Sequence, residues 1–122
     1  MPKILLIDDS TFMRQHVRGF LESGGFEVEE YLPASALEVM QKIKDSNPNL
    51  ILSDFNMPNV DGQEVARMAR RTNSAIPVVI LTATRDAPKE AYLHTIGVRR
   101  VLHKPINGEE LVKALKEVLS IA

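Results

Sequence analysis

Four widely separated places in the chain carry side chains that could act together on a phosphoryl group. Asp8 and Asp9 follow the first apolar run, and Asp54, Thr82 and Lys104 follow later ones. Clustered carboxylates repel one another unless a hard cation lies among them, and Mg²⁺ prefers carboxylate, water and phosphate oxygens. A carboxylate is also a nucleophile, while an ammonium group and a hydroxyl can bind phosphoryl oxygens. These residue types therefore predict a phosphoryl-transfer site.

Each of these residues has an ordinary structural explanation when it is considered alone. An Asp after a strand commonly caps the next helix, a Thr hydroxyl commonly closes a turn, and a Lys is usually solvated. The functional interpretation depends on their common position at the ends of successive strands, because one sheet would then bring all of them together.

The strands are predicted from short apolar runs rich in Ile, Val and Leu, which are typical of strands covered on both faces. One run differs, because Phe26 and Val28 alternate with Glu27 and Glu29. That alternation indicates a half-exposed strand at a sheet edge. The five expected strands are Ile4–Ile7, Phe26–Tyr31, Leu50–Leu52, Ile76–Leu81 and Val101–Leu102.

Amphipathic stretches separate these strands and predict helices. Gly24 and Gly25 should end the first helix, Ser35 and Glu38 have the spacing of a capping box, and Asn107 should cap the last helix. The expected helices contain the stretches Met13–Leu21, Ala36–Ile43, Val65–Ala69, Asp86–Ile96 and Leu111–Leu119.

Strands that alternate with helices imply an α/β fold with a parallel sheet and right-handed crossovers. In such sheets ligands bind beyond the carboxyl ends of the strands, near the point where the strand order reverses. We therefore expect the five polar residues Asp8, Asp9, Asp54, Thr82 and Lys104 to share one pocket.

The bulk composition excludes several other classes of protein. A chain of 122 residues suits a single domain, residues 1–122, and 15 basic against 16 acidic residues argue against nucleic-acid binding. The sequence has no Cys, which excludes disulfides and thiolate sites. No apolar run approaches the roughly 20 residues of a membrane helix. We expect a cytoplasmic protein without a membrane partner.

The segments that carry these residues resemble the receiver domains of two-component response regulators, and the resemblance extends over residues 3–122. The segments are Ile7–Ser10, Ser53–Gly62, Leu81–Ala83 and His103–Pro105, and the second is similar to single-domain regulators of the CheY type. The resemblance implies a flavodoxin-like, doubly wound (βα)5 sandwich. Its five-stranded parallel sheet would have the order 2-1-3-4-5, which agrees with an edge position for the second strand.

The resemblance also implies a role for each residue of the pocket. Asp54 is the phosphoacceptor, and it binds Mg²⁺ directly together with Asp9, while Asp8 binds the ion through water. The backbone carbonyl of Asn56 is a further metal ligand. Lys104 contacts the phosphoryl group and precedes a cis peptide bond to Pro105. The hydroxyl of Thr82 closes on a phosphoryl oxygen and acts as the switch.

The implied protein is a signalling domain rather than an enzyme. It takes its phosphoryl group from a sensor histidine kinase or a phosphotransfer protein. It passes the signal to a downstream protein through the face formed by the fourth helix, fifth strand and fifth helix. We expect a monomer or a weak, phosphorylation-dependent dimer.

Three positions depart from the family pattern and change the expected output mechanism. Val101 stands three residues before Lys104, where the family commonly has Tyr or Phe as a rotating partner of the switch hydroxyl. The small residues usual near the end of the fourth helix are replaced by Ile96 and Val98. We therefore predict that the signal travels by loop and helix movement rather than by an aromatic flip.

Three alternative classes of protein share part of this pattern, and a sequence feature counts against each. An aspartyl phosphatase would need a second carboxylate two residues after the nucleophile, where this chain has Asn56. A degenerate receiver, acting as a phosphorylation-independent interaction module, usually lacks an acidic residue or the Lys, and both are present. A flavin-binding flavodoxin would have a loop rich in Ser, Thr and Gly after the first strand, where this chain is acidic.

Overall fold

The computed structural model describes residues 1–120, in which strands and helices alternate along the chain. The strands are β1 (Lys3–Ile7), β2 (Glu27–Tyr31), β3 (Leu50–Asp54), β4 (Val78–Thr82) and β5 (Val98–His103). The helices are α1 (Thr11–Ser23), α2 (Ala36–Ser46), α3 (Gly62–Thr72), α4 (Ala87–Thr95) and α5 (Gly108–Val118). None of these helices has both the length and the apolar character that crossing a bilayer requires.

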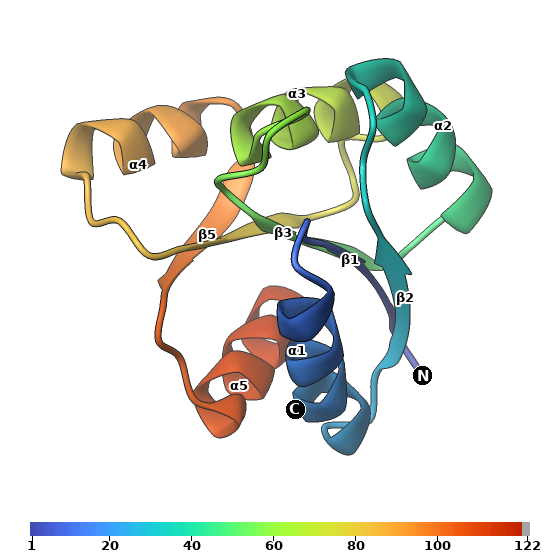
Figure 1. Ribbon diagram of the computed structural model, residues 1–122, viewed down its shortest axis with the longest axis vertical. Helices are drawn as coiled ribbons and strands as arrows, with labels where there is room; N and C mark the ends of the chain where they lie inside the picture. The colour runs from blue at the N-terminus through green and yellow to red at the C-terminus, as the bar shows by residue number, and fades with distance from the viewer. Residues whose placement is uncertain (121–122) are drawn as a thin grey trace.

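The five strands form one parallel sheet in the order β2-β1-β3-β4-β5, as the resemblance implies. Helices α1 and α5 cover one face of the sheet, and α2, α3 and α4 cover the other (Figure 1). The strand order reverses between β1 and β3, because the chain runs first to β2 on one side and later to β3 on the other. The doubly wound α/β architecture is therefore confirmed, and its reversal point lies where the carboxylates were expected.

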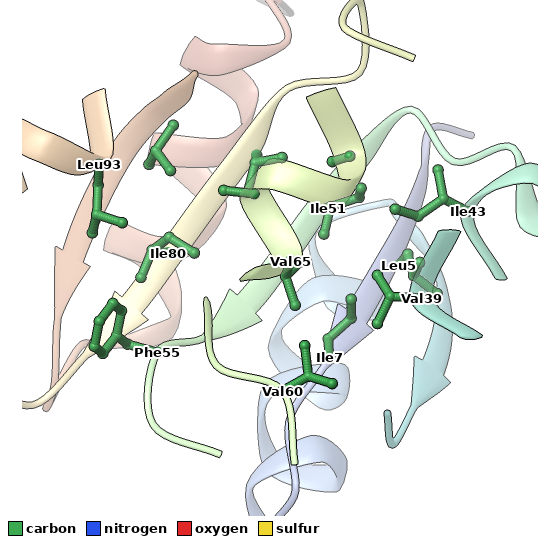
Figure 2. Packing of buried hydrophobic residues seen from close by; sticks show 14 residues of the cluster. Leu5, Ile7, Val39, Ile43, Ile51, Phe55, Val60, Val65, Ile80 and Leu93 are labelled. Atoms are coloured by element: carbon green, nitrogen blue, oxygen red, sulfur yellow. The ribbon is translucent and has the colours of Figure 1, made fainter. Parts of the chain in front are cut away.

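Two apolar clusters hold the layers together, because neighbouring residues of a strand point to opposite faces of the sheet. Leu5 and Ile7 of β1 join the cluster under α2, α3 and α4, whereas Ile4 and Leu6 join the cluster under α1 and α5. Figure 2 shows the first of these clusters, with Leu93 of α4 near Ile80 of β4. Continuous apolar runs in β1, β3 and β4 follow from this burial on both faces.

Strand β2 lies at an edge of the sheet and is half exposed, as its alternating sequence predicts. Val28 is buried and Glu27 is exposed, while the carboxylates of Glu29 and Glu30 form ion pairs. The side chains that pair with them are Lys3 and Lys42 for Glu29, and Arg14 and Arg18 for Glu30. This edge is therefore covered by charged side chains rather than by another strand.

Strand β5 differs most from the sequence expectation. It begins at Val98, before the expected apolar pair, and its backbone pairs with β4 through Arg100 opposite Val79. The consecutive arginines Arg99 and Arg100 interrupt the apolar sequence of this strand, so a search for apolar runs finds only its last part. Strand β4 begins at Val78, directly after Pro77, rather than at Ile76.

The expected capping box at the start of α2 is only half formed. Ser35 Oγ accepts a hydrogen bond from the backbone N–H of Glu38 at 3.2 Å. The Glu38 carboxylate instead accepts from the Tyr31 hydroxyl at 2.7 Å, so it does not return to the backbone of Ser35. The other caps agree with the sequence, since Gly24 follows α1 and Asn107 caps α5 through its side chain.

Candidate functional site

Three carboxylates meet at the carboxyl ends of two neighbouring strands. Asp54 is the last residue of β3, and Asp8 and Asp9 follow β1, which is hydrogen-bonded to β3. Single carboxylate oxygens of Asp8, Asp9 and Asp54 all lie within 4.8 Å of one another. The convergence of these residues, expected from the parallel sheet, is therefore present in the structure.

These carboxylates are not the caps of the helices that follow them. Ser10 caps α1, since its Oγ accepts from the backbone N–H of Met13 at 3.2 Å. Asp61 caps α3 in a reciprocal capping box with Glu64, whose carboxylate accepts from the Asp61 N–H. The simplest structural explanation for an Asp at a strand end therefore fails for Asp8, Asp9 and Asp54.

Asp8 is the most buried member of the cluster, with a relative exposure of 3%. Its Oδ1 accepts a hydrogen bond from the backbone N–H of Ser10 at 2.9 Å. Burial, followed by the nearby charge of Asp54, raises the pKa of Asp8 above its ordinary value, although the Ser10 N–H and the Lys104 charge oppose this shift. A buried carboxylate beside two others is unfavourable without a cation.

Lys104 supplies one cation to this cluster. Its Nζ donates a hydrogen bond to Asp54 Oδ1 at 2.9 Å, and both side chains are largely buried. Its backbone N–H donates to the carbonyl of Thr82 at 2.8 Å, which extends the pairing of β4 and β5 by one residue. The peptide bond between Lys104 and Pro105 is cis, as the resemblance implies.

Thr82 is the last residue of β4, which pairs with β3 on the side away from β1. It is 5% exposed, and it follows Leu81, the residue paired with Asp54 across β3 and β4. Its Oγ1 accepts from the backbone N–H of Thr84 at 3.2 Å, so the hydroxyl does close a turn. A hydroxyl that accepts in this way keeps its own proton for donation to another oxygen.

The loop after β3 passes close behind Asp54 because of Gly62. A Cβ atom on Gly62 would lie 2.9 Å from Phe55 Cα and 3.0 Å from the carbonyl oxygen of Asp54. Only a residue without a side chain lets α3 begin so close to the end of β3. Asn56 lies exposed in this loop and lines a small cavity with Thr82, and the place of its carbonyl among the metal ligands stays a prediction.

Two contacts near the pocket were missed by sequence reasoning. His103 Nε2 lies 2.9 Å from Glu90 Oε2, which joins the residue before Lys104 to helix α4. The ammonium group of Lys89, also on α4, lies 4.7 Å from the centre of the Phe55 ring. The ragged apolar pattern of α4 hints that polar side chains attach this helix, but only the fold identifies their partners.

The donor set of the carboxylate cluster fits Mg²⁺. The three side chains offer only oxygen atoms, which a small, hard dication prefers, and no His or thiolate is among them. Burial is the main cause of the raised pKa of Asp8, and a dication would offset both that burial of charge and the repulsion from Asp54 and Asp9 that adds to it. The observed chemistry of the site is thus consistent with the ion that the resemblance implies.

Comparison with known proteins agrees with this geometry. The family model described as "Response regulator receiver domain" matches residues 4–116. Among curated relatives, Response regulator MprA of Mycobacterium sp. strain KMS is 31% identical over 117 residues, 96% of this chain. The C4-dicarboxylate transport transcriptional regulatory protein DctD of Pseudomonas aeruginosa is 30% identical over 98% of this chain. The chain spans 50% of the length of that MprA and 25% of that DctD.

Solved structures show the same fold. A CheY-like receiver domain protein from Methanospirillum hungatei JF-1 has a TM-score of 0.87 and 28% identity, with 98% of this chain and 94% of that chain covered. A LuxR-family DNA-binding response regulator from Staphylococcus aureus has a TM-score of 0.86 and 25% identity, with 98% and 99% covered.

Proposed function

Since the chain belongs to the response regulator receiver domain family of two-component systems, we propose that it is a signalling switch that accepts a phosphoryl group on Asp54. One observation carries the proposal: Asp8, Asp9 and Asp54 gather their oxygens within 4.8 Å while Lys104 contacts Asp54. Neither helix capping nor core packing explains that arrangement. Receiver domains are signalling domains rather than classical enzymes, and the action proposed for this chain is on itself.

The proposed chemistry is transfer from a phosphohistidine of a sensor histidine kinase or phosphotransfer protein. A carboxylate oxygen of Asp54 forms a bond to phosphorus while the bond from phosphorus to the donor imidazole nitrogen breaks. The imidazole keeps the electron pair of that bond and takes up a proton. Asp54 suits this role because it is the last residue of β3, at the carboxyl ends of the strands, where ligands bind in this architecture.

The proposed metal ligands are Asp9 and Asp54 directly, Asp8 through water, and the backbone carbonyl of Asn56. When bound, Mg²⁺ would neutralise charge on the phosphoryl oxygens. The raised pKa of Asp8 supports this assignment, because a buried carboxylate with that environment gains stability from a nearby cation.

Lys104 and Thr82 are proposed to distinguish the phosphorylated from the unmodified pocket. Phosphorylation adds about −1.5 to −2 charge and strong acceptor oxygens. The Lys104 ammonium now contacts the Asp54 carboxylate, and it would gain a stronger partner in the phosphoryl group. The Thr82 proton would gain an acceptor as well. Only such differences in interaction energy can shift a conformational equilibrium.

Helix α4 is the proposed moving element, and with β5 and α5 it forms the proposed face for a downstream protein. Leu93 is its one buried residue, so polar contacts such as Glu90 with His103 attach much of it. His103 pairs with Thr82 across the sheet and precedes Lys104. A change at Thr82 and Lys104 can therefore reach α4 without an aromatic residue at position 101, where Val101 is partly buried.

The test uses a small-molecule phosphodonor, because the cognate kinase is unidentified. We expect the chain to incorporate phosphate from acetyl phosphate, and to bind beryllofluoride, only when Mg²⁺ is present. Asp54→Asn should abolish both, since an amide is not a nucleophile. Phosphate incorporation can be measured by intact-protein mass spectrometry.

Asp45→Asn is the matched control, because Asp45 lies exposed on α2, away from the pocket. That variant should behave like the unmodified chain. Uptake that survives in Asp54→Asn, or that is indifferent to Mg²⁺, would contradict the proposal. Complete failure of the unmodified chain to bind beryllofluoride would instead favour the degenerate receiver that acts only as an interaction module.

A further inference from the structure

The direction of the Asp9 carboxylate is not fixed by the sheet. Strand β1 ends at Ile7 and α1 begins at Thr11, so Asp9 lies exposed in the bend between them. Hydrogen bonds hold Asp8 within this bend, but none of those in the described part of the chain reaches the Asp9 carboxylate. By contrast, Asp54 is the last residue of β3, where strand pairing fixes the backbone. Of the two carboxylates proposed to bind Mg²⁺ directly, Asp9 therefore depends more on the bend for its position.

Arg14 of α1 holds the peptide group that joins Asp8 to Asp9. Its Nη1 donates a hydrogen bond to the backbone carbonyl of Asp8 at 2.6 Å. The Arg14 side chain is 14% exposed, and a hydrogen bond from a charged donor is stronger away from water. This contact therefore restrains the backbone directly before Asp9.

Arg14 is itself held from two other directions. Its Nε donates to Glu30 Oε1 of β2 at 3.3 Å, and its Nη2 donates to Thr11 Oγ1 at 3.3 Å. Glu30 is placed by backbone pairing, because it lies opposite Leu6 of β1. The planar guanidinium has donors fixed in several directions, which lets it contact Glu30 and the Asp8 carbonyl at once. Arg14 thus links the edge strand of the sheet to the bend that carries Asp9.

We propose that Arg14 is a positioning residue for the metal site, because it fixes the peptide group from which the Asp9 carboxylate extends. The inference rests on the function proposed above. The charge of Arg14 opposes a dication that binds nearby, so any benefit to Mg²⁺ binding must come from geometry. Residues that orient a metal ligand in this way commonly raise metal affinity by about 10- to 100-fold.

Arg18 offers a matched control, because it separates this role from ordinary stabilisation of the fold. It lies one turn after Arg14 on the same helix, and its Nη1 donates to the other carboxylate oxygen of Glu30 at 2.8 Å. Its Nε donates to Glu22 at 3.2 Å. No hydrogen bond from Arg18 to the Asp8 carbonyl is present among residues 1–120. Loss of Arg18 therefore removes a tie between α1 and β2 and leaves the bend intact.

The test compares Mg²⁺ binding by Arg14→Met and Arg18→Met, measured by isothermal titration calorimetry. We expect Arg14→Met to bind Mg²⁺ about tenfold more weakly than the unmodified chain, and Arg18→Met to bind it with unchanged affinity. A purely electrostatic effect of Arg14 has the opposite sign, since removal of a positive charge tightens the binding of a dication.

Arg14→Lys gives a second comparison at constant charge. An ammonium group can donate to the Asp8 carbonyl, although it lacks the fork that also holds Glu30. This variant should therefore bind Mg²⁺ more tightly than Arg14→Met and more weakly than the unmodified chain. Charge alone would place Arg14→Lys below Arg14→Met. If Arg14→Met does not fold, as judged by circular dichroism, Arg14→Lys takes its place in the comparison with Arg18→Met.

A readout without metal follows the bend itself. In EDTA, the ¹⁵N heteronuclear NOE of the Asp9 and Ser10 amides should fall in Arg14→Met and stay unchanged in Arg18→Met, because only the first variant frees this backbone. Thermal unfolding shows whether the two variants lose similar stability.

The inference is overturned if Arg14→Met binds Mg²⁺ as tightly as the unmodified chain or more tightly. It is also overturned if Arg14→Met and Arg18→Met weaken binding equally, since Arg14 would then act only through the stability of the fold. In both cases the unmodified chain still binds Mg²⁺, and the function proposed for Asp54 stands. An unmodified chain that does not bind Mg²⁺ rejects that function, and the positioning role with it.

Discussion

At the scale of single residues, the ionised Asp8 carboxylate lowers the stability of the fold at the site where it is proposed to help bind the metal. It is 3% exposed and lies beside two other carboxylates, and its pKa is raised chiefly by burial. A raised pKa means that the Asp8 carboxylate binds a proton more tightly in the folded state than in the unfolded chain. The charged form therefore destabilises the fold, and this cost increases as the pH rises above the ordinary value of 3.8.

Asp8→Asn should therefore stabilise the metal-free protein at pH 7. We expect its melting temperature in EDTA to rise by about 4 °C, which corresponds to about 1 kcal/mol for a domain of this size. Near pH 3 the gain should disappear, because Asp8 is then protonated in both states. Thermal unfolding followed by circular dichroism at the two pH values measures the effect.

Addition of Mg²⁺ provides the control for this prediction. The unmodified chain should gain more stability from Mg²⁺ than Asp8→Asn does, because the variant has lost one of the three carboxylates. A variant that is less stable than the unmodified chain in EDTA at pH 7 would show that the Asp8 carboxylate is not a destabilising charge.

At the scale of secondary-structure elements, ion pairs add to the backbone pairing with β1 that holds β2 at the edge of the sheet. Glu29 contacts Lys42 and Lys3 and accepts a hydrogen bond from Ser46 Oγ at 2.8 Å. These partners hold the pKa of Glu29 at about 2, and the hydrogen bond from Lys42 contributes most. Partial burial of Glu29 opposes this shift. A lowered pKa stabilises the fold above the ordinary value of 4.5, and this contribution is lost as the pH falls toward 2.

Glu29→Gln should accordingly destabilise the protein by about 1 kcal/mol at neutral pH, a value reduced for the partial exposure of the pair. The difference from the unmodified chain should shrink between pH 4.5 and pH 2. Urea unfolding across this range tests it. Glu27→Gln, an exposed position on the same strand, is the comparison and should change little; equal effects of the two substitutions would remove any special role for Glu29.

The strands could be predicted from the sequence wherever an apolar run dominates the segment. Apolar runs identify β1, β3 and β4, and the strand-end rule then brings together Asp8, Asp54 and Thr82 without any coordinates. The full extent of β5 could not be predicted, because backbone pairing with β4 overrides the two arginines in its sequence. The contact between His103 and Glu90 was equally inaccessible, since it depends on where α4 lies over the sheet.

At the scale of the whole molecule, the sheet separates two apolar clusters that have no buried residue in common. Ile4 of β1 and Ile80 of β4 are both fully buried, one in each cluster. Strand β3 lies between their strands, which puts the two residues on strands about 10 Å apart. The two faces of the molecule should therefore respond independently to small losses of packing.

Ile4→Val and Ile80→Val should each lower the free energy of unfolding by about 1 kcal/mol. The double variant should lose the sum of the two within about 0.5 kcal/mol, because the sites share no partners. Denaturant unfolding of the unmodified chain, the two single variants and the double variant measures the coupling between the two sites. A coupling well above 1 kcal/mol would mean that the sheet transmits repacking from one face to the other.

The charges on the outer strands also bear on how the protein behaves in concentrated solution. An open strand edge is a template on which another chain can add a strand, and such addition leads to aggregation. Here one edge carries Glu27, Glu29 and Glu30, and the other carries Arg99 and Arg100. Addition of a strand at either edge would press these charged side chains against another chain and disturb the ion pairs of Glu29, Glu30 and Arg100, so growth of fibrils from either edge is opposed from the first contact.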